Sequence, residues 1–382
     1  MKITDVEAIV LDSHLEYGAP ESGEESSGVR HCFLLKVSTD EGITGWADVE
    51  TEPHVCAAAV NAPATGSGMF EGLRHLVIGE DPFDVERLWD KIYRGTIYYG
   101  RRGVAIQMLS GFDIACYDIM GKAIGRPLHK LLGGAYRTHV RAYASTLFRP
   151  TPDAMKRACD FYLQRGFTAV KFGWGVFGQD RKRDIALVKA AREAIGDNVD
   201  LLIDPGWSVN RSAYDAIDLL RDLEPYKIFW LEDFLHPEDY EGYAKVRESH
   251  PKTRIAAGEQ EATAWGFRDL IQRGKIDVAQ PDLSRCGGVT VARKVMWEAQ
   301  SAGIDLVPHA WLTDLLTATS LHINACLPRS LFLEYNVSQN PMLSAIIKNP
   351  IELNENGEME VPQLPGLGIE VDEQAVQRFR IG

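Results

Sequence analysis

From about residue 138 onward, short apolar runs alternate with longer amphipathic stretches, and no other feature of the sequence constrains the fold as strongly. The amphipathic stretches include RDIALVKAAREAIG and AYDAIDLLRDLEPY, whose apolar residues recur at helical spacing. Strands that alternate regularly with helices are typical of a (β/α)8 barrel, so the sequence predicts this fold. The eight expected strands span residues 140–146, 167–173, 199–206, 228–234, 254–260, 277–282, 304–310 and 331–336.

The first 125 residues follow a different pattern and predict a separate α+β unit. Residues 3–12 and 31–49 have the pattern of strands, with a turn expected at Thr39–Gly42. Residues 83–125 then change to helical spacing. The last stretch, EMEVPQLPGLGIEVD, is again typical of turn and strand, and we expect it to pack back on the first unit. The expected units are an N-terminal capping domain at 1–125, completed by about 358–382, and a barrel domain at 126–357.

The composition indicates which kinds of molecule the protein is expected to bind. The net charge is −13, and an acidic surface argues against nucleic acid as the main partner. A small anionic substrate stays possible, because one bound metal ion inverts the local field. The six cysteines form no CxxC pair, which indicates reduced thiols and a cytoplasmic location. No apolar run approaches the roughly 18–20 residues that span a bilayer, so we expect no membrane partner.

Ionisable side chains stand where seven successive expected strands end. In a barrel these positions converge on the carboxyl-terminal face, where catalytic sites are built. A single acid at a strand end is usually a helix cap or a solvated loop residue. Seven in register are poorly explained in that way, and several lie within apolar strings such as LLIDPGW, where a lone charge is costly. The seven residues are Lys171, Asp204, Glu232, Glu259, Asp282, His309 and Glu334.

Three of these residues predict a metal site. Asp204, Glu232 and Glu259 end adjacent strands and form a ligand set of oxygen alone. Like charges this close need a cation, and oxygen ligation with room for water and substrate favours Mg2+ over zinc. The sequence contains neither HExxH nor His-x-His, the motifs expected of a zinc hydrolase.

Asp282 and His309 end neighbouring strands and predict a general base. A carboxylate beside an imidazole orients the ring and raises its basicity. The alternative is a buried structural pair, which the nearby metal cluster makes the weaker interpretation.

At this point the sequence resembles a known family, the enolase superfamily in its mandelate racemase subgroup. The resemblance rests on AVKFG, LLIDPGW, WLEDF, AAGEQ, AQPDLSRCGG, VPHAW and FLEYN, and it covers nearly the whole chain. It implies that Asp204, Glu232 and Glu259 bind one Mg2+ per subunit. It also implies that His309, with Asp282, removes the proton next to a substrate carboxylate, that Glu334 acts there as an acid or hydrogen-bond donor, and that the protein is a homo-oligomer.

Two positions depart from the family pattern. The family's Lys-x-Lys becomes Lys171-Phe172-Gly173, and Gly206 stands two residues after Asp204, where relatives often carry a polar side chain. Lys171 either reaches across as a second acid/base or contacts the substrate carboxylate. With a base on one side only, we expect syn β-elimination of water from an aldonic or aldaric acid, giving a 2-keto-3-deoxy acid. The alternatives are a racemase, an epimerase or a sugar-lactone cycloisomerase, and, outside enzymes, a barrel that binds metal and sugar acid without turnover.

The residues that select the substrate are harder to predict. Besides Lys171, we expect Trp311, His31 and Tyr17 to contact the substrate, although a solvated acidic loop is an equally simple interpretation of the segment before His31. Arg285 lies in a Gly-rich turn after Asp282, where a structural role is expected.

Overall fold

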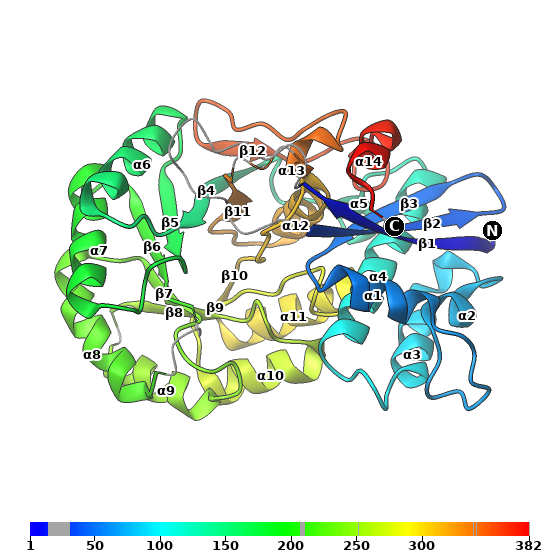
Figure 1. Cartoon of the computed structure of the whole chain (residues 1–382), viewed down its shortest axis with the longest axis horizontal. Coiled ribbons are helices and arrows are strands. Elements are labelled where there is room, and N and C mark those ends of the chain that lie inside the picture. The colour runs from blue at the N-terminus through cyan, green and yellow to red at the C-terminus, as the bar shows by residue number, and fades with distance from the viewer. Residues whose placement is uncertain (14–30, 207–210, 251, 339, 341, 382) are drawn as a thin grey trace.

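The computed structural model has two parts, a barrel and a smaller cap that packs against one side of it (Figure 1). In the described part of the chain, no helix combines the length and hydrophobicity that crossing a bilayer requires. The described residues are 1–13, 31–206, 211–250, 252–338, 340 and 342–381.

The cap begins with a three-stranded antiparallel sheet in the order β1-β2-β3. Its strands are β1 (Ile3–Asp12), β2 (His31–Thr39) and β3 (Thr44–Val49). The predicted turn between β2 and β3 is confirmed, since the Gly42 N–H donates to the Thr39 carbonyl at 3.1 Å. Gly42 has φ of 76°, a conformation that glycine adopts without strain.

Helices cover this sheet and place it against the barrel. The long helix α4 lies so close to β3 that a Cβ at Gly45 would be 2.1 Å from the Ala115 carbonyl oxygen. Glycine at this position therefore lets the helix and the sheet backbones meet, as close packing requires. The cap helices are α1 (Pro53–Asn61), α2 (Leu73–Val77), η1 (Pro82–Asp84), α3 (Val85–Gly95) and α4 (Val104–Ala123).

The barrel contains the eight parallel strands that the sequence predicted, in the order β10-β9-β8-β7-β6-β5-β4-β11. Their residues are buried on both faces, which explains why they form apolar runs without alternation. Most strands are shorter than expected, and β9 and β10 are the shortest, because Pro281 and Pro308 have no N–H to continue the ladder. The strands are β4 (His139–Leu147), β5 (Ala169–Gly173), β6 (Asp200–Asp204), β7 (Trp230–Glu232), β8 (Arg254–Ala257), β9 (Val278–Ala279), β10 (Asp305–Leu306) and β11 (Leu333–Asn336).

An outer ring of helices surrounds these strands (Figure 1). Most connecting helices are amphipathic, as expected, and bury their apolar faces against the sheet, whereas α12 is buried on all sides. They are α5 (Leu128–Leu131), α6 (Pro152–Gln164), α7 (Arg181–Ile195), α8 (Ala213–Leu223), η2 (Glu224–Tyr226), α9 (Tyr240–Ser249), α10 (Thr263–Gly274), α11 (Gly288–Ala302), α12 (Asp314–Cys326) and α13 (Met342–Ala345).

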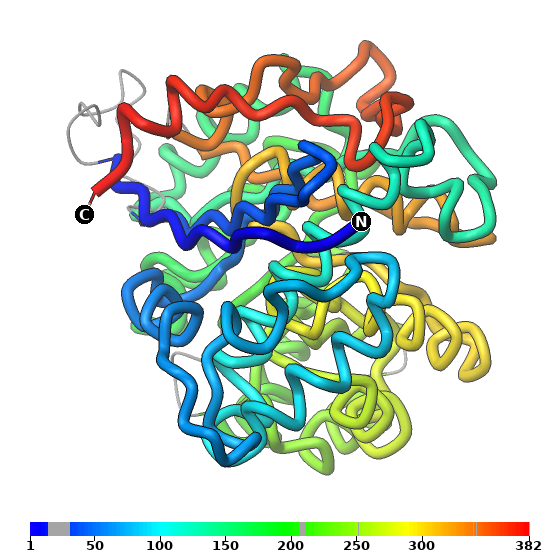
Figure 2. Tube along the Cα trace, turned by 90° about the vertical axis from the view of Figure 1, so that its right-hand side faces the viewer, coloured from blue at the N-terminus to red at the C-terminus, as the bar shows by residue number. Residues whose placement is uncertain are grey.

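The last segment joins the two parts. Strand β12 (Glu358–Glu360) pairs antiparallel with β4, and α14 (Glu373–Phe379) then packs against β1. The Ile381 N–H donates to the Val10 carbonyl at 3.0 Å, so the end of the chain lies beside the first strand (Figure 2).

Candidate active site

A cavity of about 840 Å3 opens at the carboxyl ends of the barrel strands, beneath the cap. Its floor contains Lys171 on β5, Asp204 at the end of β6 and His309 just after β10. Glu50, just after β3, and Gln107 on α4 reach it from the cap. The cavity therefore lies at the place where the sequence predicted that the charged strand ends converge.

Three buried carboxylates form one cluster in this cavity. Ligand oxygens of Asp204, Glu232 and Glu259 lie within 4.8 Å of one another. Burial and the neighbouring charge of Glu232 raise the pKa of Asp204 well above its ordinary value. Burial also raises the pKa of Glu232, whereas the adjacent His309 overcomes burial and lowers the pKa of Glu259. The cluster is therefore costly unless a cation offsets its charge.

The donor set fits a hard divalent cation. All three side chains offer oxygen, and together they carry a formal charge of −3, which is the chemistry that Mg2+ prefers. A second group, Glu50, Asp282 and His309, also brings ligand atoms within 4.8 Å. This second group has two carboxylates, and the Arg285 guanidinium already pairs with one of them, so it fits a metal less well. The residues present are thus suited to one metal ion at the carboxylate cluster.

His309 and Asp282 form a buried dyad. His309 Nδ1 lies 2.7 Å from Asp282 Oδ2, and because an ionised carboxylate only accepts, Nδ1 is the donor. Asp282 Oδ1 is fixed in turn by the Ser284 N–H at 2.7 Å and the Ser284 Oγ at 2.6 Å. Nε2 is left facing the carboxylates, 3.0 Å from Glu259 Oε2. Burial lowers the pKa of His309, but Glu334, Glu259 and Asp282 outweigh it and raise the pKa well above its ordinary value.

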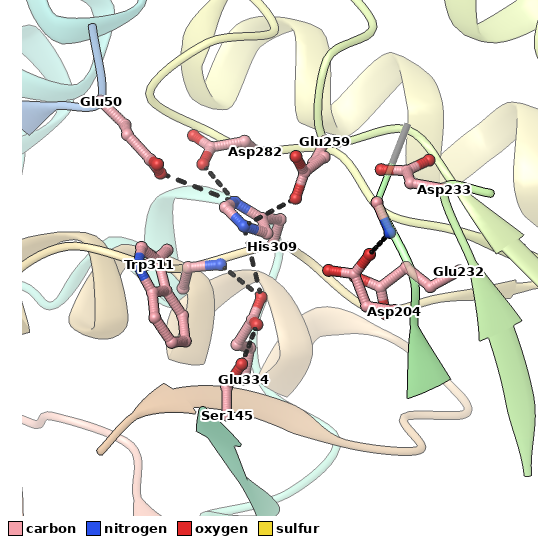
Figure 3. A network of polar contacts seen from close by, with 12 residues as sticks. Glu50, Ser145, Asp204, Glu232, Asp233, Glu259, Asp282, His309, Trp311 and Glu334 are labelled. Carbon is pink, nitrogen blue, oxygen red and sulfur yellow. Dashed lines mark hydrogen bonds and ion pairs between the residues drawn. The ribbon is translucent and has the colours of Figure 1, made fainter. Parts of the chain in front are cut away.

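Glu334 lies beneath His309 (Figure 3). Three donors hold it. Ser145 Oγ donates to Oε1 at 2.7 Å, and the Ala310 N–H donates to Oε2 at 2.9 Å. Lys171 Nζ lies 2.8 Å from Oε1. Burial raises the pKa of Glu334, but the charge of Lys171 contributes to a net lowering of this pKa, so the ionised carboxylate is favoured.

Lys171 is buried between two carboxylates. Its Nζ lies 2.5 Å from Glu232 Oε1 and 2.8 Å from Glu334 Oε1. Burial opposes the charged form, but Glu232 and Glu334 outweigh it and raise the pKa of Lys171 well above its ordinary value. A lysine held in this way is a poor proton acceptor. At Gly173 there is no room for a second lysine without movement, because a Cβ there would lie 3.0 Å from Asp204 Oδ2.

Sequence reasoning missed a contact between the cap and the dyad. Glu50 forms an ion pair with Arg285 and points toward His309, with Oε2 3.8 Å from Nδ1 (Figure 3). The Glu50 N–H donates to Ser284 Oγ at 3.0 Å, so the cap backbone also supports Asp282. Arg285 therefore has polar contacts at the site in addition to the structural role expected for it. The sequence signal for this contact was slight: Glu50 directly follows the expected strand region 31–49, and Arg285 lies three residues after Asp282.

Of the three further residues predicted to contact the substrate, one lines the cavity, one lies outside its lining, and one falls outside the described residues. Trp311 lines the cavity, and its carbonyl accepts from Asn336 Nδ2 at 3.1 Å. His31 is outside the lining, at the start of β2, where Nε2 lies 3.4 Å from Asp12 Oδ2. Tyr17 lies outside the described residues.

Two family descriptions match the chain. Residues 153–375 match "Enolase C-terminal domain-like", and residues 24–133 match "Mandelate racemase / muconate lactonizing enzyme, N-terminal domain". The first match includes every strand-end residue from Lys171 to Glu334.

Individual relatives match over most of their length. The D-galactarolactone cycloisomerase of Agrobacterium fabrum is 33% identical, with 100% of this chain and 99% of that protein covered. The D-galactonate dehydratase of Xanthomonas euvesicatoria pv. vesicatoria is also 33% identical, with 91% and 90% covered. The crystal structure of the 3,6-anhydro-D-galactonate cycloisomerase from Zobellia galactanivorans is 28% identical, covers 100% of both chains and has a TM-score of 0.87.

Proposed function

The chain belongs to the mandelate racemase and muconate lactonizing enzyme family of the enolase superfamily, and on this basis we propose that it is a Mg2+-dependent sugar acid dehydratase. The substrate is an aldonic or aldaric acid, and the product is a 2-keto-3-deoxy acid. In reaction class the protein is thus a hydro-lyase, as the relatives named as dehydratases are.

The observation that carries this proposal is a single histidine, oriented by a carboxylate, on one side of the cavity. His309 is oriented by Asp282 at 2.7 Å, whereas Lys171 is held by Glu232 and Glu334. A racemase that works by two bases needs one on each face of the carbon. In the described lining, the position for the second base holds Gly173, so inversion lacks its second proton carrier.

The residues then have distinct tasks. Asp204, Glu232 and Glu259 would hold Mg2+, which stabilises negative charge on the substrate carboxylate when it is bound. Lys171 lies beside this cluster, held by Glu232 and Glu334, and its ammonium orients the same carboxylate. His309 Nε2 removes the α-proton, while Asp282 holds the ring and stabilises the imidazolium. The imidazolium returns the proton to the departing β-hydroxyl, water leaves, and the enol product tautomerises to the keto acid.

A screen of aldonic and aldaric acids with Mg2+ tests the proposal. The expected product reacts with semicarbazide and is lighter than the substrate by one water. In D2O, rapid α-deuteration with inversion and without a keto product would refute the dehydratase and favour a racemase. His309→Asn is the matched variant: metal and ligand binding without turnover in both proteins would favour a binding protein.

A sugar-lactone cycloisomerase is the second candidate. Two relatives named as cycloisomerases match over the whole chain, one in sequence and one in structure. A single base suits this reaction as well, because it also begins with loss of an α-proton. The two candidates differ in mass balance: a cycloisomerase converts a lactone into a product of unchanged mass, whereas a dehydratase loses water from an open-chain acid.

A further inference from the structure

The cavity wall between β5 and β6 is formed by Trp174, which is half-buried and follows Gly173. Its φ of 46° lies in the left-handed region, which a residue with a bulky side chain rarely adopts. Two hydrogen bonds hold this backbone: the Trp174 N–H donates to the Asp204 carbonyl at 3.0 Å, and the Phe177 N–H donates to the Trp174 carbonyl at 3.1 Å. Strain of this kind persists where the surroundings enforce it, and it is frequent at ligand sites.

Two glycines make room for this arrangement. A Cβ at Gly206 would lie 2.9 Å from Cδ2 and Cε2 of Trp174, so the indole rests on the Gly206 backbone. A side chain at Gly173 would press on the Asp204 carboxylate, since its Cβ would be 3.0 Å from Oδ2. The two departures from the family pattern therefore belong to one local structure.

In the strand order, this wall lies away from the strand that precedes His309. In the strand order, β6 lies four positions from β10, and the hydrogen bond from the Ala310 N–H to Glu334 brings β10 and β11 together to close the ring. In a ring of eight strands, four positions correspond to opposite sides. Trp174 follows β5 and packs on Gly206 after β6, so it borders the cavity on the side away from the base.

We propose that Trp174 is a substrate-positioning residue whose indole packs against the C–H face of the sugar acid, on the side opposite His309. The inference rests on the proposed function, because it requires a polyhydroxylated carbon chain in the cavity. Such a chain has apolar C–H faces between its hydroxyls, and an aromatic ring removes them from water. The indole N–H does not exchange protons with a carbon acid, so this wall adds no second base opposite His309.

Trp174→Gly separates this role from a structural one. Glycine adopts a φ of 46° freely, so the variant loses the indole and also the backbone strain. We expect KM for the best sugar acid to rise by about tenfold or more, with a smaller change in kcat and an unchanged Tm. Trp174→Phe keeps a ring and should recover most of the affinity. Trp297→Ala, at a tryptophan that is 70% exposed on α11, is the control and should behave like the wild type.

A second measurement reports positioning directly. In D2O, a loosely held substrate is reprotonated more often before its hydroxyl leaves. The ratio of α-deuterated substrate to keto product should therefore rise in Trp174→Gly and return toward the wild-type ratio in Trp174→Phe. If the glycine variant fails to fold, Trp174→Asn serves instead, because asparagine tolerates positive φ.

The outcomes are distinct. Wild-type KM and a wild-type deuteration ratio in the glycine or asparagine variant overturn the role of Trp174 and leave the dehydratase intact. Absence of turnover by the wild type with every sugar acid and lactone refutes the proposed function, and the role of Trp174 with it.

Discussion

Asp48 connects the cap to the loop that follows His309, and replacing it by asparagine should change how stability depends on pH. The side chain is 1% exposed, and its Oδ2 accepts from the Thr313 N–H at 2.9 Å and from Thr313 Oγ1 at 2.6 Å. Burial raises the pKa of Asp48 from 3.8 to about 7, against the effect of these hydrogen bonds. Asparagine keeps an acceptor oxygen at the same place but has no proton to lose.

The sign follows from proton binding. Between pH 4 and pH 7 the folded protein keeps the Asp48 proton and the unfolded chain has lost it, so this group makes stability fall as pH rises. The slope is at most about 1.4 kcal/mol per pH unit, and the loss over the interval is at most about 4 kcal/mol. The stabilisation is fully present below pH 4 and is lost as the pH passes through 7.

Urea unfolding of both proteins at several values of pH from 5 to 8 measures this effect. Burial also raises the pKa of Asp113 and of Asp314 to about 7, so the wild-type curve contains their contributions. Both remain in Asp48→Asn, and the difference between the curves isolates Asp48. The free energy of unfolding of Asp48→Asn, relative to that of the wild type, should increase as pH rises. A constant change in stability caused by the amide does not alter this trend. Parallel curves would refute the assignment of a buried, protonated Asp48.

Four further predictions concern the site. His309→Asn should lower kcat by about 10²–10⁴, with an unchanged circular dichroism spectrum, when keto acid formation is assayed; near-normal turnover would exclude His309 as the base. Removal of divalent ions with EDTA should abolish activity, and added Mg2+ should restore it. Asp204→Asn should require more Mg2+ for half-maximal activity than the wild type, and equal requirements would exclude Asp204 as a ligand. Arg285→Met should cost about 3 kcal/mol of unfolding free energy, because it leaves Glu50 without its cation, and Glu50→Gln in the same chain should recover part of that loss. A double variant no more stable than the single one in urea would contradict this pairing.

The barrel and its strand-end residues were predictable because their signal is local. A charged residue such as Asp204 inside LLIDPGW is conspicuous. Because a charged residue recurs at each of these strand ends, the sequence predicts that the side chains meet at the carboxyl-terminal face, without knowledge of tertiary contacts. The parallel order of strands then brings Asp204, Glu232 and Glu259 together, and their ligand oxygens lie within 4.8 Å of one another. No comparable local signal marks Glu50.

Contacts between the cap and the barrel were not predictable, because they depend on how the two parts dock. Glu50 and Ser284 are 234 positions apart and are joined by one hydrogen bond. His31 differs from Glu50: its place near a cap loop suggested a substrate contact, and its side chain lies beside Asp12, outside the described cavity lining. A position near a loop does not determine the direction of a side chain, which depends on strand register.

The division of the cavity into a barrel floor and a cap roof has a consequence for the evolution of this enzyme. The charged residues of the floor share ion pairs, so a mutation at one of them disturbs several others at once. The roof comes from separate cap segments, such as those with Thr51 and Gln107, whose uncharged side chains take no part in these ion pairs. Selection for a new substrate therefore has more freedom in the roof, and a mutant library directed there should retain more active clones than one directed at the floor.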